Sequence, residues 1–454
     1  MIRIIIPTAL RLRVGQTLSH SVRSAAAKAT ASSIHGRSHY SNTIQHRAQS
    51  TTTATSEESS TAAASSRLYM WGSDTSSSTS TNLLKQPNFL DTKVFSVPFA
   101  VEHPFSSPVQ NVVCGAAETA FILEDGTCYV MGENKQGQLG LGHTNPVTEP
   151  TQLVLPSNLP IQQISLGPKF AAVVDQEGDL FTMGYGGSAM NGMGWLGHGD
   201  ATAHHTPTLV ESLVEDGCAV AQVQVSELHM TVLTTEGEVL STGAGSYGRL
   251  GNFDSIDQLY LEPVEVLTEA SGVTQLAGGK SFTLALTSEG VAYSWGRNHK
   301  GQLGTGLGLA VDIYAMQNIP EPIEADELLG RRVTKLSAGH SHAACITEQG
   351  ELFLWGMGQH FDPIRVNELL HTKVVDVACG QDYTLVVDEE GRMYSFGVAS
   401  AGMTGGTTGV LGQGSKVARL NQATLMEAFE AENVKVTQVS AGWKHAACLV
   451  EPRE

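Results

Sequence analysis

The 454 residues include no apolar run that reaches the ~18 residues needed for a membrane-spanning helix. Six cysteines are present, but none forms a Cys-x-x-Cys pair, so the spacing indicates neither a metal site nor a disulfide framework. Basic residues form no cluster longer than Arg331-Arg332. These absences disfavour a membrane-spanning chain, a metal-stapled domain and a direct DNA-binding protein.

Aspartate and glutamate are absent from the first fifty residues, which hold seven basic residues and are rich in Ser, Thr and Ala. This composition is typical of an organellar transit peptide. We therefore expect a mitochondrial transit peptide at residues 1–50 and a Ser/Thr-rich disordered linker at residues 51–66, although a plastid address fits the same composition. Beyond residue 50, 20 basic residues (27 minus 7) stand against 45 acidic ones, a net charge of −25 that repels nucleic acid.

The main feature that is present is a unit that recurs seven times, most clearly at residues 338–356 and 378–397. Each copy holds a step of small residues, an apolar run, an acidic-Gly turn, and an apolar pair followed by glycine. The closing glycines are spaced by 60, 52, 59, 53, 60 and 41 residues. They are Gly72, Gly132, Gly184, Gly243, Gly296, Gly356 and Gly397.

The two ends of the array hold complementary halves of one unit. Residues 68–72 form a closing half with no opening half before it, and residues 436–450 form an opening half with no closing half after it. Pairing these halves would close a ring and remove the open sheet edges. Turns such as Glu289-Gly290 lie between short β-branched runs, as hairpins require. We predict an all-β, seven-bladed β-propeller over residues 67–454.

The unit resembles the RCC1 repeat (regulator of chromosome condensation), with a match over about residues 67–450. Besides the hairpin core, the resemblance rests on the tail Gly-Gln-Leu-Gly, which stands at 137–140, 248–251 (with Arg for Gln) and 301–304, and in degenerate form at 194–197. The chain has no Trp-Asp dipeptide and no periodic glycine pairs, which disfavours the WD40 and kelch propellers.

The repeat also accounts for residues that look like sites. Gly278-Gly279-Lys280-Ser281 aligns with an opening step, and Thr274 stands where a phosphate-binding loop needs glycine. We expect a structural role for the histidines that share one repeat position, and burial for the cysteine pairs that share positions. We expect a solvent-exposed loop rather than a metal site for the three histidines of the insertion. The histidines that share one repeat position are His229, His342 and His445. The cysteine pairs are Cys114 with Cys379 and Cys345 with Cys448, and the histidines of the insertion are His198, His204 and His205.

The resemblance implies that acidic and histidine residues just after the opening step meet a partner GTPase. The matching candidates here are Glu118, Lys169, Glu227, Lys280, His340, Gln381, Asp382 and Lys444. Only Asp382 keeps an acid directly before the usual histidine position, which is Tyr383 here, and this departure disfavours Ran-type exchange. Insertions at 185–205, 307–329 and 398–414 are further candidates for specificity.

The expected function is that of a non-enzymatic mitochondrial propeller in the matrix or on the inner membrane. By resemblance, it would be a monomeric scaffold or guanine-nucleotide exchange factor for an organellar GTPase, linked to mitoribosome assembly. No cofactor and no metal are expected. Two alternatives are a nuclear Ran-type exchange factor and a UVR8-like photoreceptor. The second is disfavoured by only five tryptophans and a single motif of that type, at 442–445.

Overall fold

The computed structural model describes residues 67–73, 94–103, 105–268, 271–306, 313–399 and 407–453. The predicted transit peptide and linker, residues 1–66, lie outside the described residues. The described residues all belong to one compact unit, Ala62–Glu454. No helix within them is long and apolar enough to cross a membrane.

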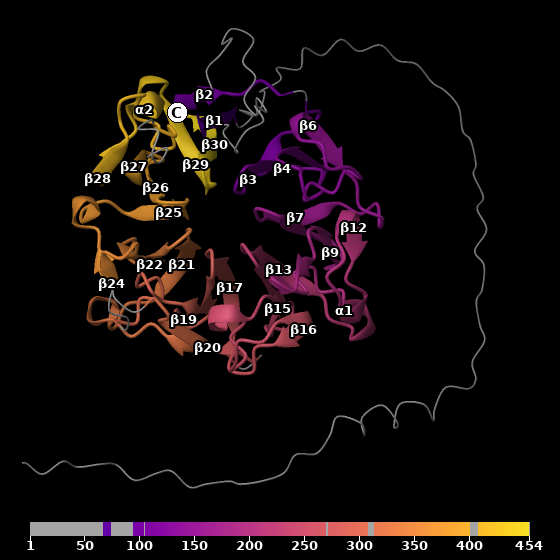
Figure 1. Ribbon diagram of the computed structural model, residues 1–454. Coiled ribbons are helices and arrows are strands. Elements are labelled where there is room, and N and C mark those ends of the chain that lie inside the picture. The colour runs from indigo at the N-terminus through magenta and orange to yellow at the C-terminus, as the bar shows by residue number, and fades with distance from the viewer. Residues whose placement is uncertain are drawn as a thin grey trace, which may run out of the picture. The chain divides into compact units, whose positions relative to one another are not determined.

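Seven four-stranded antiparallel sheets, blades A to G, form a ring in the described part of the chain (Figure 1). From the inner to the outer strand, the blades are A, β29 (Val434–Ala441), β30 (His445–Pro452), β1 (Arg67–Ser73) and β2 (Val94–Ala100); B, β3 (Val109–Cys114), β4 (Glu118–Leu123), β5 (Cys128–Gly132) and β6 (Val147–Leu153); C, β7 (Ile161–Leu166), β8 (Phe170–Asp175), β9 (Leu180–Gly184) and β12 (His204–Leu209); D, β13 (Val220–Val225), β14 (His229–Thr234), β15 (Val239–Gly243) and β16 (Gln258–Pro263); E, β17 (Val273–Gly278), β18 (Phe282–Thr287), β19 (Ala292–Arg297) and β20 (Met316–Pro322); F, β21 (Val333–Ala338), β22 (His342–Thr347), β23 (Leu352–Gly356) and β24 (His360–Arg365); and G, β25 (Val374–Cys379), β26 (Tyr383–Asp388), β27 (Met393–Val398) and β28 (Arg419–Leu425).

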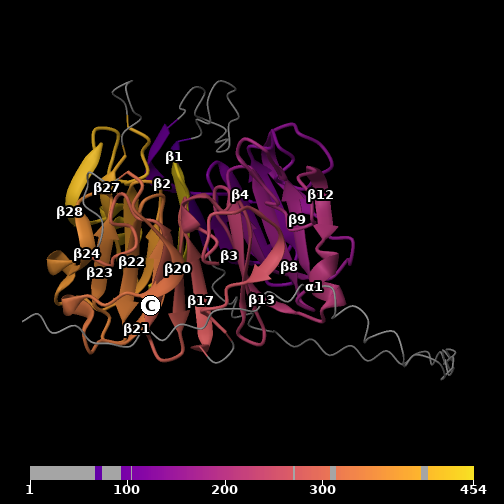
Figure 2. The same ribbon diagram turned by 60° about the horizontal axis from the view of Figure 1, so that its bottom comes forward.

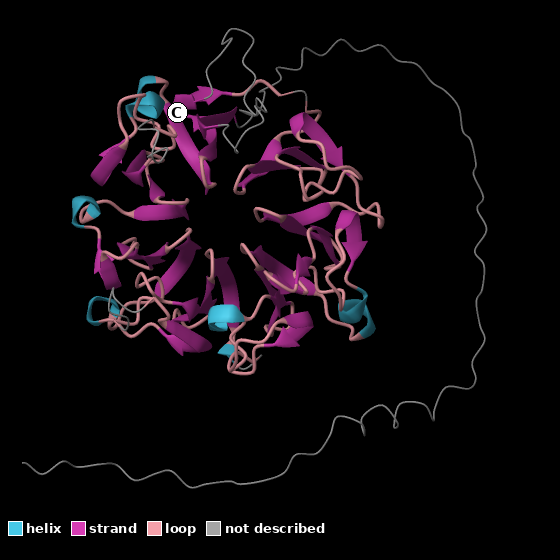
Figure 3. Ribbon diagram, viewed as in Figure 1, coloured by secondary structure: helices cyan, strands magenta, loops and turns pink. Residues whose placement is uncertain are grey.

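The remaining elements are short, and Figure 3 shows a ring built of strands and their connecting loops, with only small helical segments. They are the hairpin β10 (Gly187–Ser188) and β11 (Gly192–Met193), the helices α1 (Glu211–Glu215) and α2 (Glu427–Ala431), and the 3-10 turns η2 (Ser246–Gly248), η4 (Asp326–Leu328) and η5 (Asn367–Leu369).

Blade A confirms the predicted ring closure. Its strand β1 pairs with β30, so that Leu68 lies opposite Leu449 and Gly72 lies opposite His445. The C-terminus accordingly lies beside β1 and β2 in Figure 1. Strands from both ends of the array thus complete one blade, and no unit is left with an unpaired half.

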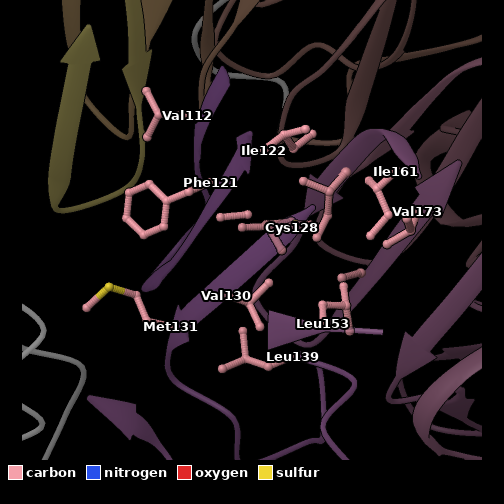
Figure 4. Close-up of a cluster of buried hydrophobic side chains, with 14 of the residues drawn as sticks. Val112, Phe121, Ile122, Cys128, Val130, Met131, Leu139, Leu153, Ile161 and Val173 are labelled. Carbon is pink, nitrogen blue, oxygen red and sulfur yellow. The ribbon is translucent and has the colours of Figure 1, made fainter. Parts of the chain in front are cut away.

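The second strand of each blade is apolar because it is covered on both faces. Every residue of β8 and of β26 is buried, for example. One such core joins blades B and C, where Val130 and Leu153 lie near Ile161 and Val173 (Figure 4). Burial on both faces favours continuous apolar runs over alternation, which explains the pattern seen in the sequence.

The loops of each blade divide between two faces of the ring because the antiparallel strands alternate in direction (Figure 2). The predicted hairpins between second and third strands lie on one face, and their glycines have the positive φ that such turns require, for example 83° at Gly290. The loops between inner and second strands, here called the opening turns, share the other face with the loops between third and outer strands, here called the tail loops. Two sets of loops distant in sequence thus meet on one face.

Candidate functional site

The opening turns of all seven blades meet at the centre of the ring, where they line a cavity of about 130 Å³ that we call the mouth. Consecutive turns touch through their backbones: His340 N–H donates to the Gly380 carbonyl at 3.2 Å, and Trp443 N–H donates to the Gly115 carbonyl at 3.1 Å. A Cβ at Gly339 would overlap the Gly380 carbonyl oxygen. The small residues of the opening step are therefore needed for this close approach.

Three of the eight predicted partner-binding residues line the mouth together, namely Glu227, Lys280 and His340. The Lys280 ammonium lies 3.2 Å from the Glu227 carboxylate. The ring of His340 meets that of Trp443 edge-on, with 5.7 Å between centroids. Burial, followed by the charge of Lys280, lowers the pKa of His340 to about 4, so its imidazole is neutral at pH 7.

The other predicted residues lie apart from this group. The ammonium of Lys169 lies over the Trp195 ring, 5.4 Å from its centroid, in a cation–π contact. Gln381 and Asp382 follow the opening step of blade G and are partly exposed, as is Lys444 in blade A. Burial raises the pKa of Asp382, and the nearby charge of Lys300 opposes this shift.

Glu118 is buried in blade B and occupies the position that histidine holds in three other blades. Its carboxylate accepts hydrogen bonds from Gln138 Nε2 at 3.0 Å and from the Ala117 amide at 2.8 Å. Burial raises its pKa to about 7. Glu118 therefore belongs to the interior of the blade rather than to the accessible rim of the mouth.

The three histidines of that position link neighbouring blades, as their expected structural role requires. Each donates or accepts one hydrogen bond with a buried threonine of the next blade. The pairs are His229 with Thr283 at 3.0 Å, His342 with Thr384 at 3.0 Å and His445 with Thr119 at 2.9 Å. The cysteines that share repeat positions are also free and largely buried, with only Cys114 partly exposed.

The insertion at 185–205 is less exposed than expected, because it packs on blade D. Trp195 and Leu196 are buried within it, and the Met193 amide donates to the Asp257 carboxylate at 3.1 Å. His198 forms a 2.8 Å hydrogen bond with the Thr182 hydroxyl and is only partly exposed. The loop therefore joins two blades, and of its three histidines His198 and His204 are partly buried, whereas His205 is exposed as expected.

A group of cations beside the mouth was not found from the sequence. Arg249, Arg297 and Lys300 come from the tail loops and ends of blades D and E. The Arg297 guanidinium lies 4.3 Å from the centroid of the Tyr247 ring. Burial, followed by the charges of Arg297 and Lys300, lowers the pKa of His299 to about 4. No sequence motif reveals this group of cations, because only the topology of the blades brings tail loops and opening turns to the same face.

Binding is the chemistry that this face offers. It combines a neutral imidazole, an ion pair and several cations around a backbone-lined opening. Among the described residues, no group of three or more His, Cys, Asp or Glu side chains is arranged to hold a metal ion. A closed ring of seven blades whose loops meet at a charged mouth defines the protein as a loop-presenting β-propeller.

Comparison with known proteins agrees with this class. The RCC1-like domain family matches residues 63–363, which is 301 of the 454 residues, and the chain belongs to this family. Members of the family are mostly exchange factors or binding proteins rather than covalent catalysts.

Three curated relatives illustrate the range of the family. The ultraviolet-B receptor UVR8 of Arabidopsis thaliana is 35% identical over 55% of this chain and 53% of its own length. The mitochondrial RCC1 domain-containing protein RUG3 of the same plant is 29% identical over 58% of this chain and 57% of its own. The secretion-regulating guanine nucleotide exchange factor of Bos taurus is 32% identical over 51% and 48%. The chain thus matches about half the length of each.

The fold is also that of a solved propeller, Prp20p of Saccharomyces cerevisiae, whose structure was described with its binding to Gsp1p and histones. It superposes with a TM-score of 0.72 at 18% identity, over 87% of this chain and 93% of Prp20p. At this identity the likeness concerns the architecture alone.

Proposed function

We propose that the protein is a non-enzymatic mitochondrial RCC1-like propeller that binds an organellar GTPase, as its scaffold or exchange factor, in mitoribosome assembly. The observation that carries the proposal is the mouth, where all seven opening turns converge and Glu227, Lys280 and His340 lie on one rim. Loops held by a rigid scaffold are where binding residues usually lie. Exchange requires no covalent step, because the factor need only stabilise the nucleotide-free partner.

The charges near the mouth suggest how a partner is selected. The protein carries a net charge of −25 beyond residue 50, yet Lys280, Arg297 and Lys300 lie close enough to His299 to lower its pKa. A local group of cations on an acidic body favours a partner that presents acidic side chains to this sector. Of the eight residues predicted from sequence, the proposal therefore rests on the partly exposed ones, with Glu118 excluded by its burial.

Two observations support a mitochondrial address. The basic, acid-free first fifty residues have the composition of a transit peptide, and one relative, RUG3, is named as mitochondrial. A tagged full-length chain should therefore localise to mitochondria. A steady nuclear or cytosolic location would overturn this part of the proposal.

Partner binding is tested by affinity capture from mitochondrial lysate and by release of labelled GDP from each recovered GTPase. The test variant is Lys280→Glu, which breaks the pair with Glu227 at the mouth. The matched control is Lys373→Glu, which breaks an equally long pair, 3.2 Å to Glu389, beside the hairpin glycine Gly350 on the opposite face. We expect only Lys280→Glu to weaken capture. Equal capture by both variants would place the binding surface elsewhere, and unchanged GDP release with intact capture would leave the scaffold role alone.

A further inference from the structure

The tail loop of blade F differs from the other described tail loops. Only residues 357–359 connect β23 to β24, and they lack the Gly-x-Leu-Gly tail. The same shortening underlies the step of 41 residues between the closing glycines Gly356 and Gly397, where the other steps are 52 to 60. Blade F therefore contributes no tail to the gap between itself and blade G.

Elsewhere the tail fills the gap between two blades. Its leucine is buried in each of five described tails, and so is the residue before it. The buried leucines are Leu139, Leu196, Leu250, Leu303 and Leu411, and the residues before them are Gln138, Trp195, Arg249, Gln302 and Val410. The sequence alone showed four of these tails, and the fifth, at 409–412, is recognised from its position in blade G.

The tail lies on the side chain that precedes the closing glycine of the next blade. The Trp355 indole donates to the Gln302 carbonyl at 2.9 Å, and the Trp295 indole donates to the Arg249 carbonyl at 3.1 Å. A Cβ at Gly304 would come within 2.9 Å of the Trp355 ring, which explains the glycine after the leucine. The tails of blades D, E and G are thus short peptides held by a tryptophan floor, whereas Met183 and Thr242 take its place at the tails of blades B and C.

The gap between blades F and G is correspondingly open and forms a groove of about 540 Å³. Phe396 precedes the closing glycine Gly397 and so occupies the place of Trp295 and Trp355. Those tryptophans are 0% and 2% exposed, whereas Phe396 remains partly exposed and lines the groove with Leu354. The groove has the floor of a tail site without its tail.

The charge at the inner end of the groove indicates which residue should precede the leucine in a tail-like peptide that binds there. Asp382 lines the groove from the opening turn of blade G, and its carboxyl is partly buried. In blade B, the corresponding tail residue Gln138 directs its amide to Glu118 at 3.0 Å and to the Pro168 carbonyl in the opening turn of the next blade at 3.4 Å. By strand register Pro168 corresponds to Gln381, the residue before Asp382, so a hydrogen-bond donor at this tail position would lie beside Asp382.

We propose that the groove between blades F and G binds a partner protein through a loop of the type Gly-(Gln or Arg)-Leu-Gly, which completes the ring as a tail in trans. The leucine covers Phe396, and the donor side chain before it reaches the Asp382 carboxylate. The proposal deepens the partner-binding role by adding a second contact surface. It concerns a different place from the mouth, so that Lys280→Glu, which lies outside the groove, tests the mouth separately.

The probe is a fluorescein-labelled peptide copied from the chain's own tail in blade E, Asn298 to Gly306, titrated with the full-length protein and followed by anisotropy. We expect saturable binding that weakens about tenfold or more when the peptide leucine is replaced by aspartate, because a buried leucine contributes ~1.5–3 kcal/mol. A peptide with arginine in place of glutamine should bind several-fold more tightly to the native protein than to Asp382→Asn.

The blocking variant is Ala423→Trp, which places a large side chain in the groove from β28, where Ala423 is partly buried against the core cluster that includes Leu369. The matched control is Glu262→Trp, an exposed site on the outer strand β16 of blade D, whose own gap holds Leu250. Circular dichroism and thermal melting confirm that both variants fold. Peptide binding should be lost only in Ala423→Trp.

Three results would overturn the proposal: no anisotropy change with the native protein, binding that persists in Ala423→Trp, or binding that is unchanged when the peptide leucine is replaced by aspartate. Light scattering provides a further check. A concentration-dependent dimer that Ala423→Trp converts to monomer would identify a second copy of the chain as the occupant, and would contradict a partner loop.

Discussion

The indole Nε1 of Trp355 donates a hydrogen bond to the carbonyl oxygen of Gln302, 2.9 Å away and one blade earlier in the ring. The same bond joins Trp71 to Val410 at 2.8 Å across the gap between blades G and A. A contact that recurs between different pairs of blades is a property of the ring rather than of one loop. It ties the closing tryptophans Trp71, Trp295 and Trp355 to the tails of the preceding blades.

Removing one tail leucine should therefore loosen two blades. Leu303→Ala deletes a side chain that is 1% exposed between blades E and F, and we expect the free energy of unfolding to fall by about 2–5 kcal/mol. Leu370→Ala, at a leucine that is 42% exposed, should change it by less than about 0.5 kcal/mol. Urea unfolding measures both. Equal losses would show that the tail does not support the ring.

Ring closure should depend strongly on Gly72. This residue has φ 111°, and a Cβ there would overlap the Lys444 carbonyl oxygen and the His445 backbone across the β1–β30 pairing. Gly217 also has a positive φ, 71°, but nothing lies within 4 Å of its Cβ position. We expect Gly217→Ala to cost about 1 kcal/mol and Gly72→Ala to cost several times more. Thermal melting of the two variants gives the comparison, and similar melting temperatures would contradict it.

The sequence predicted the ring because its evidence was repeated. The small-residue step, the hairpin glycine and the closing glycine each occur in several copies, and the half-units at the two ends identified the closure through residues 68–72 and 436–450. The structural role of His342 and its counterparts followed from a shared repeat position in the same way. Repetition averages out the uncertainty of any single segment.

The site was less predictable because it depends on contacts between segments that are distant in sequence. Glu118 was aligned with accessible residues, although it occupies the buried histidine position of blade B. Arg249 and Lys300 come from tail loops that the repeat pattern does not connect with the opening turns, although their charges interact with Glu227 and His340 of the mouth. The groove beside Phe396 arises from the absence of a tail, which appears in the sequence only as one short step.

Glu118 should make the protein less stable as the pH rises. Burial raises its pKa to about 7 in the folded state, from an ordinary value of 4.5, so the folded protein binds the proton more tightly. Its contribution is present below pH 4.5 and is lost as the pH rises through 7. The loss amounts to about 2–3 kcal/mol between pH 5 and pH 8.

Replacing Glu118 by glutamine, which resembles the protonated acid, should remove this loss. Urea unfolding at pH 5 and pH 8 measures the change. Glu177→Gln, at an exposed hairpin position of blade C, provides the control. An unchanged pH dependence in Glu118→Gln would mean that the buried carboxyl is not the source.

The histidine pairs should act in the opposite direction. Burial lowers the pKa of His342 to about 4 from 6.5, so the unfolded chain binds the proton more tightly than the folded protein. The contribution of neutral His342 is present above pH 6.5 and is lost as the pH falls through 4, by about 3 kcal/mol. His342→Gln keeps a side chain able to bond with Thr384 and should lessen this acid loss. His205→Gln, at an exposed histidine, should leave the acid profile unchanged.

Substitution of Arg249 should affect the stability of the ring and the binding of a partner in different ways. It holds the tail position occupied by Gln138 and Gln302 in blades B and E, yet its side chain is only 2% exposed. Its Nε and Nη1 atoms have no hydrogen-bond partner among the described residues, and burial lowers its pKa to about 10. A buried charge with incomplete partners is costly, so Arg249→Gln should leave stability unchanged or raise it by about 1 kcal/mol.

The same substitution removes a cation close to Glu227 and the mouth, because the charge of Glu227 is felt at Arg249. We therefore expect Arg249→Gln to weaken capture of the proposed GTPase partner several-fold while the unfolding midpoint stays or rises. The reciprocal change, Gln302→Arg, places an arginine in the tail of blade E and should lower the free energy of unfolding by about 1–3 kcal/mol. A marked loss of stability in Arg249→Gln would instead show that the arginine supports the ring. The presence of a buried charge at this position would then be explained by stability, without a binding partner.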